Sequence, residues 1–438
     1  MKPTRPLIVI LLITAAHYFH HQLTALVVPL LPFMRDGFGL TYTQAGGLVS
    51  AFALSYGIGQ LPAGWLADRI GPRYLLLAGI TGVAAAGILV GLSRTYLALV
   101  LFLILMGIMG GGYHPSATPI ISMAVPPHQR GRAVGIHLVG GSASHLVAPL
   151  LGVAIAGVLG WRGSFLVIAT PVFVLGVVVF VLFGRLTFAP ESGVSTTVAA
   201  PGAPGAPDAI GPDAIGPEPD AAERAGPGEG AARASLKGTV SSRRVGFFLA
   251  LTCVMGAFIA SIVAFLPLFL VDVLGAGESV AAFALALFYS AGFWAAPMGG
   301  ILADRFGPSV VFTAVAIAVG PVIVLLGLSG GVVGATVLLL LLGGVMFVRM
   351  TVSESFLVDA VSPARRSTVL GIYFFAGMEG SGIITPLLGN LIDRFGFRFA
   401  FTTIGVVTMV LLVVLAGAST WLNRPRTAPD LYCLSRNR

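Results

Sequence analysis

Long apolar runs separated by short polar turns make up nearly the whole chain outside one central segment. A helix needs about 20 mostly apolar residues to cross a bilayer, and on that rule the pattern predicts twelve spanning helices. The first run continues beyond the length of a signal-peptide core and leads into further membrane segments, so we expect an uncleaved first helix. The approximate ranges are 7–33, 44–66, 74–93, 96–122, 132–157, 162–184, 244–271, 278–302, 309–328, 331–356, 367–390 and 398–420.

A polar motif between the second and third runs returns between the eighth and ninth. Residues 64–73 read GWLADRIGPR and residues 300–308 read GILADRFGP, which places Asp68 and Asp304 236 positions apart. Residues 130–135 and 366–371 match in the same way, as do 149–152 and 386–389 with one residue of slip. The repetition predicts two six-helix bundles in the same orientation, at 1–185 and 243–422, related by a pseudo-twofold axis.

The segment 186–242 separates the two bundles and has a different composition. It is rich in Pro, Gly, Ala and acidic residues and cannot bury enough apolar surface to fold. We therefore expect a disordered linker there. Nineteen Lys and Arg residues lie on the side of the membrane that carries the termini and five on the other side, with Arg349 left inside a helix. Both termini, the linker and the tail at 423–438 are therefore expected to be cytoplasmic. This predicts a multi-pass protein of the inner (plasma) membrane.

Composition excludes several other classes of protein. The chain is 56% hydrophobic and 10% charged, with a mean hydropathy of +0.96, whereas a soluble domain carries about 25% charged residues. The net charge of +8 comes from basic residues scattered singly between apolar runs, so no nucleic-acid partner is expected. Two cysteines, Cys253 and Cys433, provide neither a disulfide framework nor a cysteine metal site.

The repeated motif resembles the signature loop of the major facilitator superfamily, on the residues Gly64, Asp68, Arg69, Gly71 and Arg73. The resemblance covers nearly the whole chain, and it implies the fold of that superfamily: two six-helix bundles around a midplane cavity. The second copy is weaker because Ser309 and Val310 follow where the last arginine would stand. It consists of Gly300, Asp304, Arg305 and Gly307.

The resemblance also implies a role for the two loops as parts of a cytoplasmic gate. Asp68 would face the start of the eleventh helix, and Asp304 the start of the fifth. A carboxylate near a helix N-terminus contributes about 0.3–2 kcal/mol. The alternative is a pair of tight turns with solvated charges.

A narrower resemblance links Tyr113-His114-Pro115, Gly140-Gly141-Ser142 and the stretch 19–44 to the fosmidomycin-resistance branch of exporters. Residues 148–152 resemble the Gly-Pro motif of drug/proton antiporters, from which they depart at Ala148. These resemblances imply proton-coupled export of a small organic compound.

Ionisable groups at membrane depth are costly and are candidates for function. Arg349 lies within the tenth predicted helix and Glu379 midway along the eleventh. A static pair between them would hold two helices together. Alternatively, Arg349 binds an anionic substrate while Glu379 takes up a proton.

Histidines and one tyrosine form a second set of polar candidates. Spacings of three and four residues place the first three on one flank of the first helix, and histidine titrates near neutral pH. We expect this set to line a substrate and proton cavity, although hydrogen bonding between helices explains it equally well. A metal site is conceivable, but no nearby carboxylate or cysteine completes it, so no metal is expected. The residues are His17, His20, His21, Tyr113, His114, His137 and His145.

Together the patterns favour a secondary transporter that works by alternating access, without cofactor, as a monomer in the bilayer. No glycine pair is followed by the Lys-Ser/Thr of a phosphate loop, which argues against ATP-driven transport. Proton-coupled export of a small molecule is the leading prediction, and proton-linked uptake of an organic anion at Arg349 is the rival. A membrane-embedded metalloenzyme and a channel are the weaker alternatives.

Overall fold

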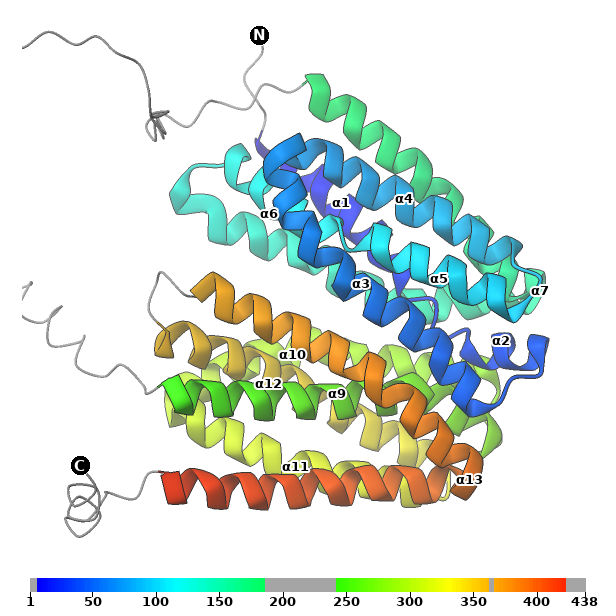
Figure 1. Cartoon of the computed structure of the whole chain (residues 1–438), viewed down its shortest axis with the longest axis vertical. Coiled ribbons are helices and arrows are strands. Elements are labelled where there is room, and N and C mark those ends of the chain that lie inside the picture. Colours follow the sequence, from blue (N-terminus) through cyan, green and yellow to red (C-terminus); the bar gives the residue numbers. More distant parts are fainter. Residues whose placement is uncertain (1–5, 186–241, 362–365, 423–438) are drawn as a thin grey trace, which may run out of the picture.

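The computed structural model describes residues 6–185, 242–361 and 366–422. Within these ranges the chain is helical, and the helices form two bundles that follow the order of the sequence (Figure 1). The predicted linker and tail lie outside the described residues, apart from Ser242, with which the second bundle begins. The first bundle contains α1 (Pro6–Thr24), α2 (Leu31–Phe38), α3 (Tyr42–Ile70), α4 (Pro72–Leu92), α5 (Tyr96–Gly110), α6 (Tyr113–Ala124), η1 (Pro127–Gln129) and α7 (Arg130–Arg185).

The second bundle repeats the first at the level of single turns. It contains α9 (Ser242–Asp272), α10 (Glu278–Phe306), α11 (Pro308–Leu328), α12 (Val332–Ala360) and α13 (Arg366–Leu422). Both α7 and α13 reverse direction inside their assigned ranges, at Gly160 and Gly396, where φ is 70° and 79°. A side chain is strained at such positive φ values, which explains glycine at both reversals.

Nine helices of the described residues are long and apolar enough to cross a membrane, and two of these contain the reversals. Helix α3 is not among the nine, because polar residues such as Gln44, Ser50 and Gln60 are spread along it. The all-helical fold in two halves is confirmed, and the count of twelve spans stays a prediction.

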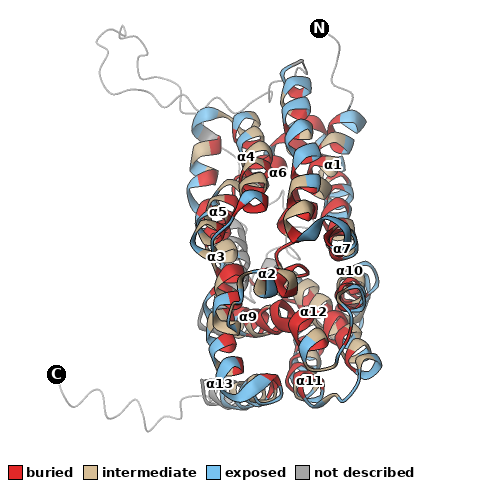
Figure 2. Ribbon diagram, turned by 90° about the vertical axis from the view of Figure 1, so that its right-hand side faces the viewer, coloured by how far each residue is buried: buried red, intermediate tan, exposed pale blue. Residues whose placement is uncertain are grey.

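Apolar side chains cover the outside of both bundles as well as their cores. Val158, Val333 and Val413 are 83%, 79% and 73% exposed, and exposed positions alternate with buried ones along most helices (Figure 2). Exposed apolar area of this extent exceeds what a water-soluble monomer presents. It is the surface expected against lipid.

The first predicted run, 7–33, is one helix followed by a turn and a short second helix. Helix α1 ends at Thr24, residues 25–30 form turns, and α2 begins at Leu31. Pro29 and Pro32 lack a backbone N–H and disfavour helical geometry in the residues before them. Apolar character alone did not reveal this break.

The most extensive packing between the bundles is that of α3 on α13 and of α7 on α10, with smaller contacts of α2 and α3 on α9. Glycine allows the first pair to approach closely. A Cβ at Gly46 would lie 2.9 Å from the carbonyl oxygen of Thr385, and Ser50 donates a hydrogen bond to the carbonyl of Gly382 across the same contact. Small residues bring helix backbones together in membranes in this way.

Candidate functional site

A cavity of about 310 Å³ lies between the two bundles and is lined from both. The first bundle contributes His21, Tyr56 and His145, together with small and apolar residues of α1 and α3. The second contributes side chains of α9, α10, α12 and α13, including Thr252, Gly256, Tyr289, Met346, Arg349, Met350, Tyr373 and Ser381. A site shared between halves can open to either side as the halves move.

Arg349, on α12, is the buried cation of this cavity, with 5% of its surface exposed. Its Nη1 donates to the carbonyl oxygen of Thr252 at 2.9 Å and to the hydroxyl of the same residue at 2.7 Å. A Cβ at Gly256 would lie 3.2 Å from Nη2 of Arg349. Both contacts come from α9, so that helix holds the guanidinium in place through Thr252 and leaves room for it at Gly256.

The charge of Arg349 is not matched by any carboxylate within ion-pair distance among the side chains that the structure describes. Its Nε is buried without a hydrogen-bond partner there. The side chain of Glu379, the predicted partner, lies outside the described residues. An arginine cannot lose its proton, so the described part of the site presents a fixed positive charge to the cavity.

The histidines form a layer in the first bundle, and only part of it reaches the cavity. His21 and His145 line the cavity, and the ring of His145 lies 5.3 Å from that of Tyr289 in the other bundle. Behind them, His17 stacks between His137 and Tyr113, with ring centroids 4.1 Å and 5.4 Å apart. The remaining members also contact one another: His20 stacks on Tyr113 at 4.6 Å, and His114 lies 5.3 Å from His21.

Hydrogen bonds fix several of these rings. His17 Nδ1 donates to the carbonyl of His137 at 2.8 Å, and His145 Nδ1 donates to the carbonyl of Gly141 at 2.9 Å. Tyr113 donates to the carbonyl of Ile13 at 3.0 Å. The predicted residues thus contact one another, and their role as a substrate and proton site stays a prediction. The sequence did not single out Tyr56, Thr252 and Tyr289 in the wall, because lone hydroxyl residues in apolar helices carry no distinctive pattern.

A gate of charged and polar contacts closes the end of the molecule at which α2 lies between the bundles (Figure 2). Arg35 of α2 forms a two-pronged ion pair with Asp272 at the end of α9, and Tyr42 donates to the same carboxylate at 2.9 Å. Burial alone would lower the pKa of Arg35, but the hydrogen bonds from its guanidinium to Asp272 and Asp36 raise it overall. Arg35 therefore stays charged, and the pair joins the two bundles.

Asp393 of α13 completes this gate at the start of α3. Its carboxylate accepts from the backbone N–H groups of Tyr42 and Thr43, both at 2.8 Å, and from the Thr43 hydroxyl at 2.5 Å. A carboxylate that accepts the free N–H groups of a first turn stabilises the helix end. One bundle thus caps a helix of the other, and the sequence did not single out Asp272 or Asp393 for this role.

The repeated motifs lie at the opposite end of the helices from the gate, where α3 meets α4 and α10 meets α11. Gly71 and Gly307 have φ of 93° and 87°, and each donates its N–H four residues back, to Ala67 and Ala303, at 2.9 Å. Glycine occupies these two positions of the motif because other residues are strained at such positive φ values.

The charged residues of the motifs make contacts within their own halves. Arg73 donates from Nε and Nη2 to the carbonyl of Phe180 on α7, at 3.2 and 2.9 Å. Arg69 and Arg305 lie over Trp65 and Phe306. A Cβ at Gly64 or Gly300 would meet nothing within 4 Å, so neither glycine is there for a close approach.

Of the two motif aspartates, the structure describes the side chain of Asp304 only, so the predicted contact of Asp68 with the opposite half stays a prediction. Asp304 is exposed and makes no ion pair or side-chain hydrogen bond with any described residue. The side chain of Asp68 lies outside the described residues. Among the described residues, the ion pair and the carboxylate cap that join the halves lie at the α2 end.

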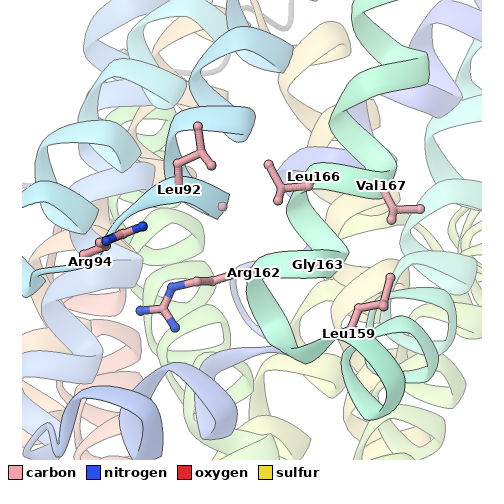
Figure 3. A pocket seen from close by; sticks show the side chains of 8 residues that line it. Leu92, Arg94, Leu159, Arg162, Gly163, Leu166 and Val167 are labelled. Carbon is pink, nitrogen blue, oxygen red and sulfur yellow. The ribbon is translucent and has the colours of Figure 1, made fainter.

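A second hollow, of about 590 Å³, is larger but has a different setting (Figure 3). It lies within the first bundle, where Leu92 and Arg94 face Leu159, Arg162, Leu166 and Val167 of α7. Because only one half lines it, rocking of the two bundles cannot expose it alternately. The cavity at Arg349 is therefore the candidate site for transport.

The profile of the Major Facilitator Superfamily matches residues 10–347 and 247–431. The chain belongs to this superfamily. Its membership makes the chain a membrane transporter rather than an enzyme, which confirms the resemblance found in the repeated motif.

Individual relatives match shorter stretches. The probable sulfoacetate transporter SauU of Cupriavidus necator is 36% identical over 139 residues, which is 31% of this chain and 32% of that protein. A probable L-galactonate transporter of Escherichia coli is 35% identical over 135 residues, covering 31% and 30%. The multidrug resistance protein MdtG of Salmonella paratyphi C is 32% identical over 173 residues, covering 38% and 42%. Each match spans less than half of the relative.

Solved structures resemble the chain over nearly its whole length. A bacterial homologue of the human lysosomal transporter Spinster, in an inward-facing and unoccupied conformation, has a TM-score of 0.71 at 19% identity and covers 95% of this chain and 96% of its own. A POT family transporter in complex with 5-aminolevulinic acid has a TM-score of 0.74 at 15% identity and covers 96% and 97%. At these identities the likeness shows the fold alone.

Proposed function

We propose that the chain transports a small organic anion, which binds at Arg349 in the cavity between the two bundles. The observation that carries this proposal is the buried guanidinium of Arg349, held by Thr252 and with no described carboxylate within ion-pair distance. Glu354, the nearby described carboxylate on the same helix, interacts with Arg349 only at longer range. A buried cation is stable only when an anion or water satisfies it. An anionic substrate supplies that partner during part of each transport cycle.

The surroundings of Arg349 suit a carboxylate or sulfonate. Guanidinium N–H groups pair with such oxygens in two parallel, charge-assisted hydrogen bonds, and Thr252 occupies Nη1 only. Tyr56, Tyr289 and Tyr373 line the same cavity. Two relatives that match part of the chain are named for the organic anions sulfoacetate and L-galactonate, which supports the same class of substrate.

The gate at α2 gives the direction in which the site is closed. With both termini cytoplasmic, the ion pair between Arg35 and Asp272 lies on the outer side of the inner membrane. The cavity is then sealed from outside, and the motif loops at Asp68 and Asp304 would meet the opposite half when the cytoplasmic side closes. One monomer contains both halves and needs no partner for this exchange.

Protons are the coupling ion that the cavity favours. His21 and His145 line the wall opposite Arg349, and imidazoles are the side chains that exchange protons near neutral pH. A proton that enters with the anion offsets its charge, so an inward proton gradient drives uptake.

Transport by purified protein in liposomes tests the proposal. Small carboxylates and sulfonates, including galactonate and sulfoacetate, should enter faster when the outside is made acidic. Arg349→Lys should transport them far more slowly, because an ammonium group lacks the planar arrangement of N–H donors that pairs with two oxygens at once. Transport of the anions by Arg349→Ala at the parent rate would contradict the role of Arg349. Transport rates that do not change with the imposed pH gradient would contradict proton coupling but not the role of Arg349.

Export of an apolar drug is the second candidate, and the match to the multidrug resistance protein MdtG supports it. Aromatic and methionine side chains such as Phe52, Met346 and Met350 line part of the cavity and would contact such a compound. In this case neutral compounds would compete for transport, and Arg349→Ala would leave their rates unchanged.

A further inference from the structure

We infer that the histidine layer of the first bundle holds a binding site for one divalent transition-metal ion, formed by His17, His21 and His114. One ring nitrogen from each of the three lies within 4.8 Å of the other two. The ring centroids form a nearly equal-sided triangle, with separations of 4.8, 5.3 and 5.3 Å. Three imidazoles that converge in this way are a ligand set for zinc and its neighbours.

The backbone arranges the three rings from two helices. His17 and His21 are four residues apart on α1, so they share one face of that helix. His114 comes from the first turn of α6, directly after the interruption at Gly111 and Gly112 that separates α5 from α6. Sequence spacing places His17 and His21 on one flank of the first helix, but only the fold brings His114, which the sequence had assigned to the cavity set, to the same point.

One ligand is already oriented for a metal. The Nδ1 of His17 donates to the carbonyl of His137, and a carbonyl can only accept, so the proton of the neutral ring lies on Nδ1. Its Nε2 therefore carries a lone pair, and this atom is buried without a hydrogen-bond partner, in a residue that is 3% exposed. Such a second-shell bond to a carbonyl is the usual support of a metal-binding histidine.

The distances require only a small closure. Tetrahedral zinc with Zn–N bonds of 2.0–2.1 Å places its nitrogens about 3.4 Å apart. Binding therefore requires the rings to move closer together, and His21 and His114 are half-buried rather than fully enclosed. His21 also lines the cavity, which gives an ion a route to the three nitrogens.

The chemistry of the ligands selects the ion. Imidazole nitrogens suit Zn²⁺, Co²⁺, Ni²⁺ and Cu²⁺, whereas Mg²⁺ and Ca²⁺ need oxygen ligands. Protons compete with metals for the same nitrogens, so binding weakens as the pH falls. The site depends on the histidines alone and stands whether or not the cavity accepts an anion.

Metal titration of the detergent-purified full chain, prepared without a polyhistidine tag and stripped with chelator, tests this inference. We expect one Co²⁺ per chain with the visible absorption of a tetrahedral nitrogen site, displaced by Zn²⁺, and a Zn²⁺-dependent rise in melting temperature. His21→Gln and His114→Gln should each weaken binding by at least about tenfold. His128→Gln, at the exposed histidine of η1, is the matched control and should bind as the parent does.

His17→Gln should show the same loss, and the two half-buried positions decide the question if the buried variant does not fold. Melting curves without metal establish that the variants are folded. A parent that binds no stoichiometric Co²⁺ or Zn²⁺ would overturn the inference, as would binding that His21→Gln and His114→Gln retain.

Discussion

Tyr113 and Arg349 lie at equivalent positions of the two bundles, 236 residues apart, and each donates a hydrogen bond to a main-chain carbonyl of the first helix in its own half. Tyr113 reaches Ile13 on α1 at 3.0 Å, and Arg349 reaches Thr252 on α9 at 2.9 Å. The motif aspartates, Asp68 and Asp304, have the same separation. The two halves thus make contacts of the same kind with different side chains, although the acceptors, Ile13 and Thr252, are 239 rather than 236 positions apart.

In a second pair of contacts, both residues are related by the internal repeat. His17 Nδ1 donates to the carbonyl of His137, and Cys253 Sγ contacts the carbonyl of Tyr373 at 3.8 Å, with both members shifted by 236 positions. The first half carries imidazoles where the second carries a thiol and a phenol. The two halves therefore share a scaffold, and they face the cavity with different chemistry: imidazoles on one side and a fixed cation on the other.

Gly256→Ala should weaken anion binding without removing the cation. The new Cβ would lie 3.2 Å from Nη2 of Arg349 and would displace the guanidinium slightly. We expect a loss of about 1 kcal/mol, or about fivefold in dissociation constant, measured by titration of galactonate or sulfoacetate. Gly246→Ala is the control on the same helix, since a Cβ there meets nothing within 4 Å. Equal affinities of the two variants would show that Gly256 does not position Arg349.

Asp393→Ala should loosen the gate at α2. The change removes the acceptor for two backbone N–H groups and one hydroxyl at the start of α3, a loss of about 1–2 kcal/mol, or about 5–30-fold in the equilibrium between closed and open forms. The measurement is the rate at which a membrane-impermeant thiol reagent, added from outside, labels Ala53→Cys in the cavity. Cys253 and Cys433 are first replaced by serine.

Asp36→Ala is the matched control for the gate. Asp36 is an exposed carboxylate at the same end of the molecule, and its ion pair with Arg35 lies within one half. It should leave the labelling rate within about twofold of the parent, since exposed pairs contribute about 0–1 kcal/mol. A rate in Asp393→Ala no higher than in Asp36→Ala would show that this carboxylate does not hold the bundles together.

Arg73→Ala should destabilise the first bundle. The substitution leaves the carbonyl of Phe180 on α7 without two charge-assisted donors, at a cost of about 1–3 kcal/mol. Arg305→Ala, at an exposed motif arginine with a ring contact to Phe306, should change stability by less than about 0.5 kcal/mol. Melting curves in detergent compare the two, and equal curves would contradict a structural role for Arg73.

The sequence predicted the fold because the bilayer imposes simple rules. Apolar runs of sufficient length, the repeated Asp-Arg motif and the glycines that follow it indicated two like-oriented bundles. The break at Pro29 between α1 and α2 was missed, since apolar character continues through it. Helix α3 is less apolar than its neighbours, and it is also the helix that packs on α13 of the other half. Its polar residues therefore occur on a helix that joins the two bundles.

The candidate site was predicted in its residue types and only partly in its geometry. Arg349, His21 and His145 line the cavity as expected, because ionisable groups in apolar helices are rare and conspicuous. His17, His20 and Tyr113 instead lie behind them in the first bundle, which helical spacing alone could not show. The gate at α2 was missed because Asp272 and Asp393 stand near helix ends, where a carboxylate is common, and only the fold shows their contacts with the opposite half.

Melting of the detergent-purified protein with a panel of organic anions, zwitterions and apolar drugs tests the central claim most directly. A ligand that binds the folded state raises the apparent melting temperature by mass action. We predict that small carboxylates or sulfonates stabilise the parent, and that Arg349→Ala loses this shift while its unliganded protein stays folded. Stabilisation of the parent and of Arg349→Ala by the same anions, or by apolar compounds alone, would contradict the assignment of Arg349 as the substrate-binding residue.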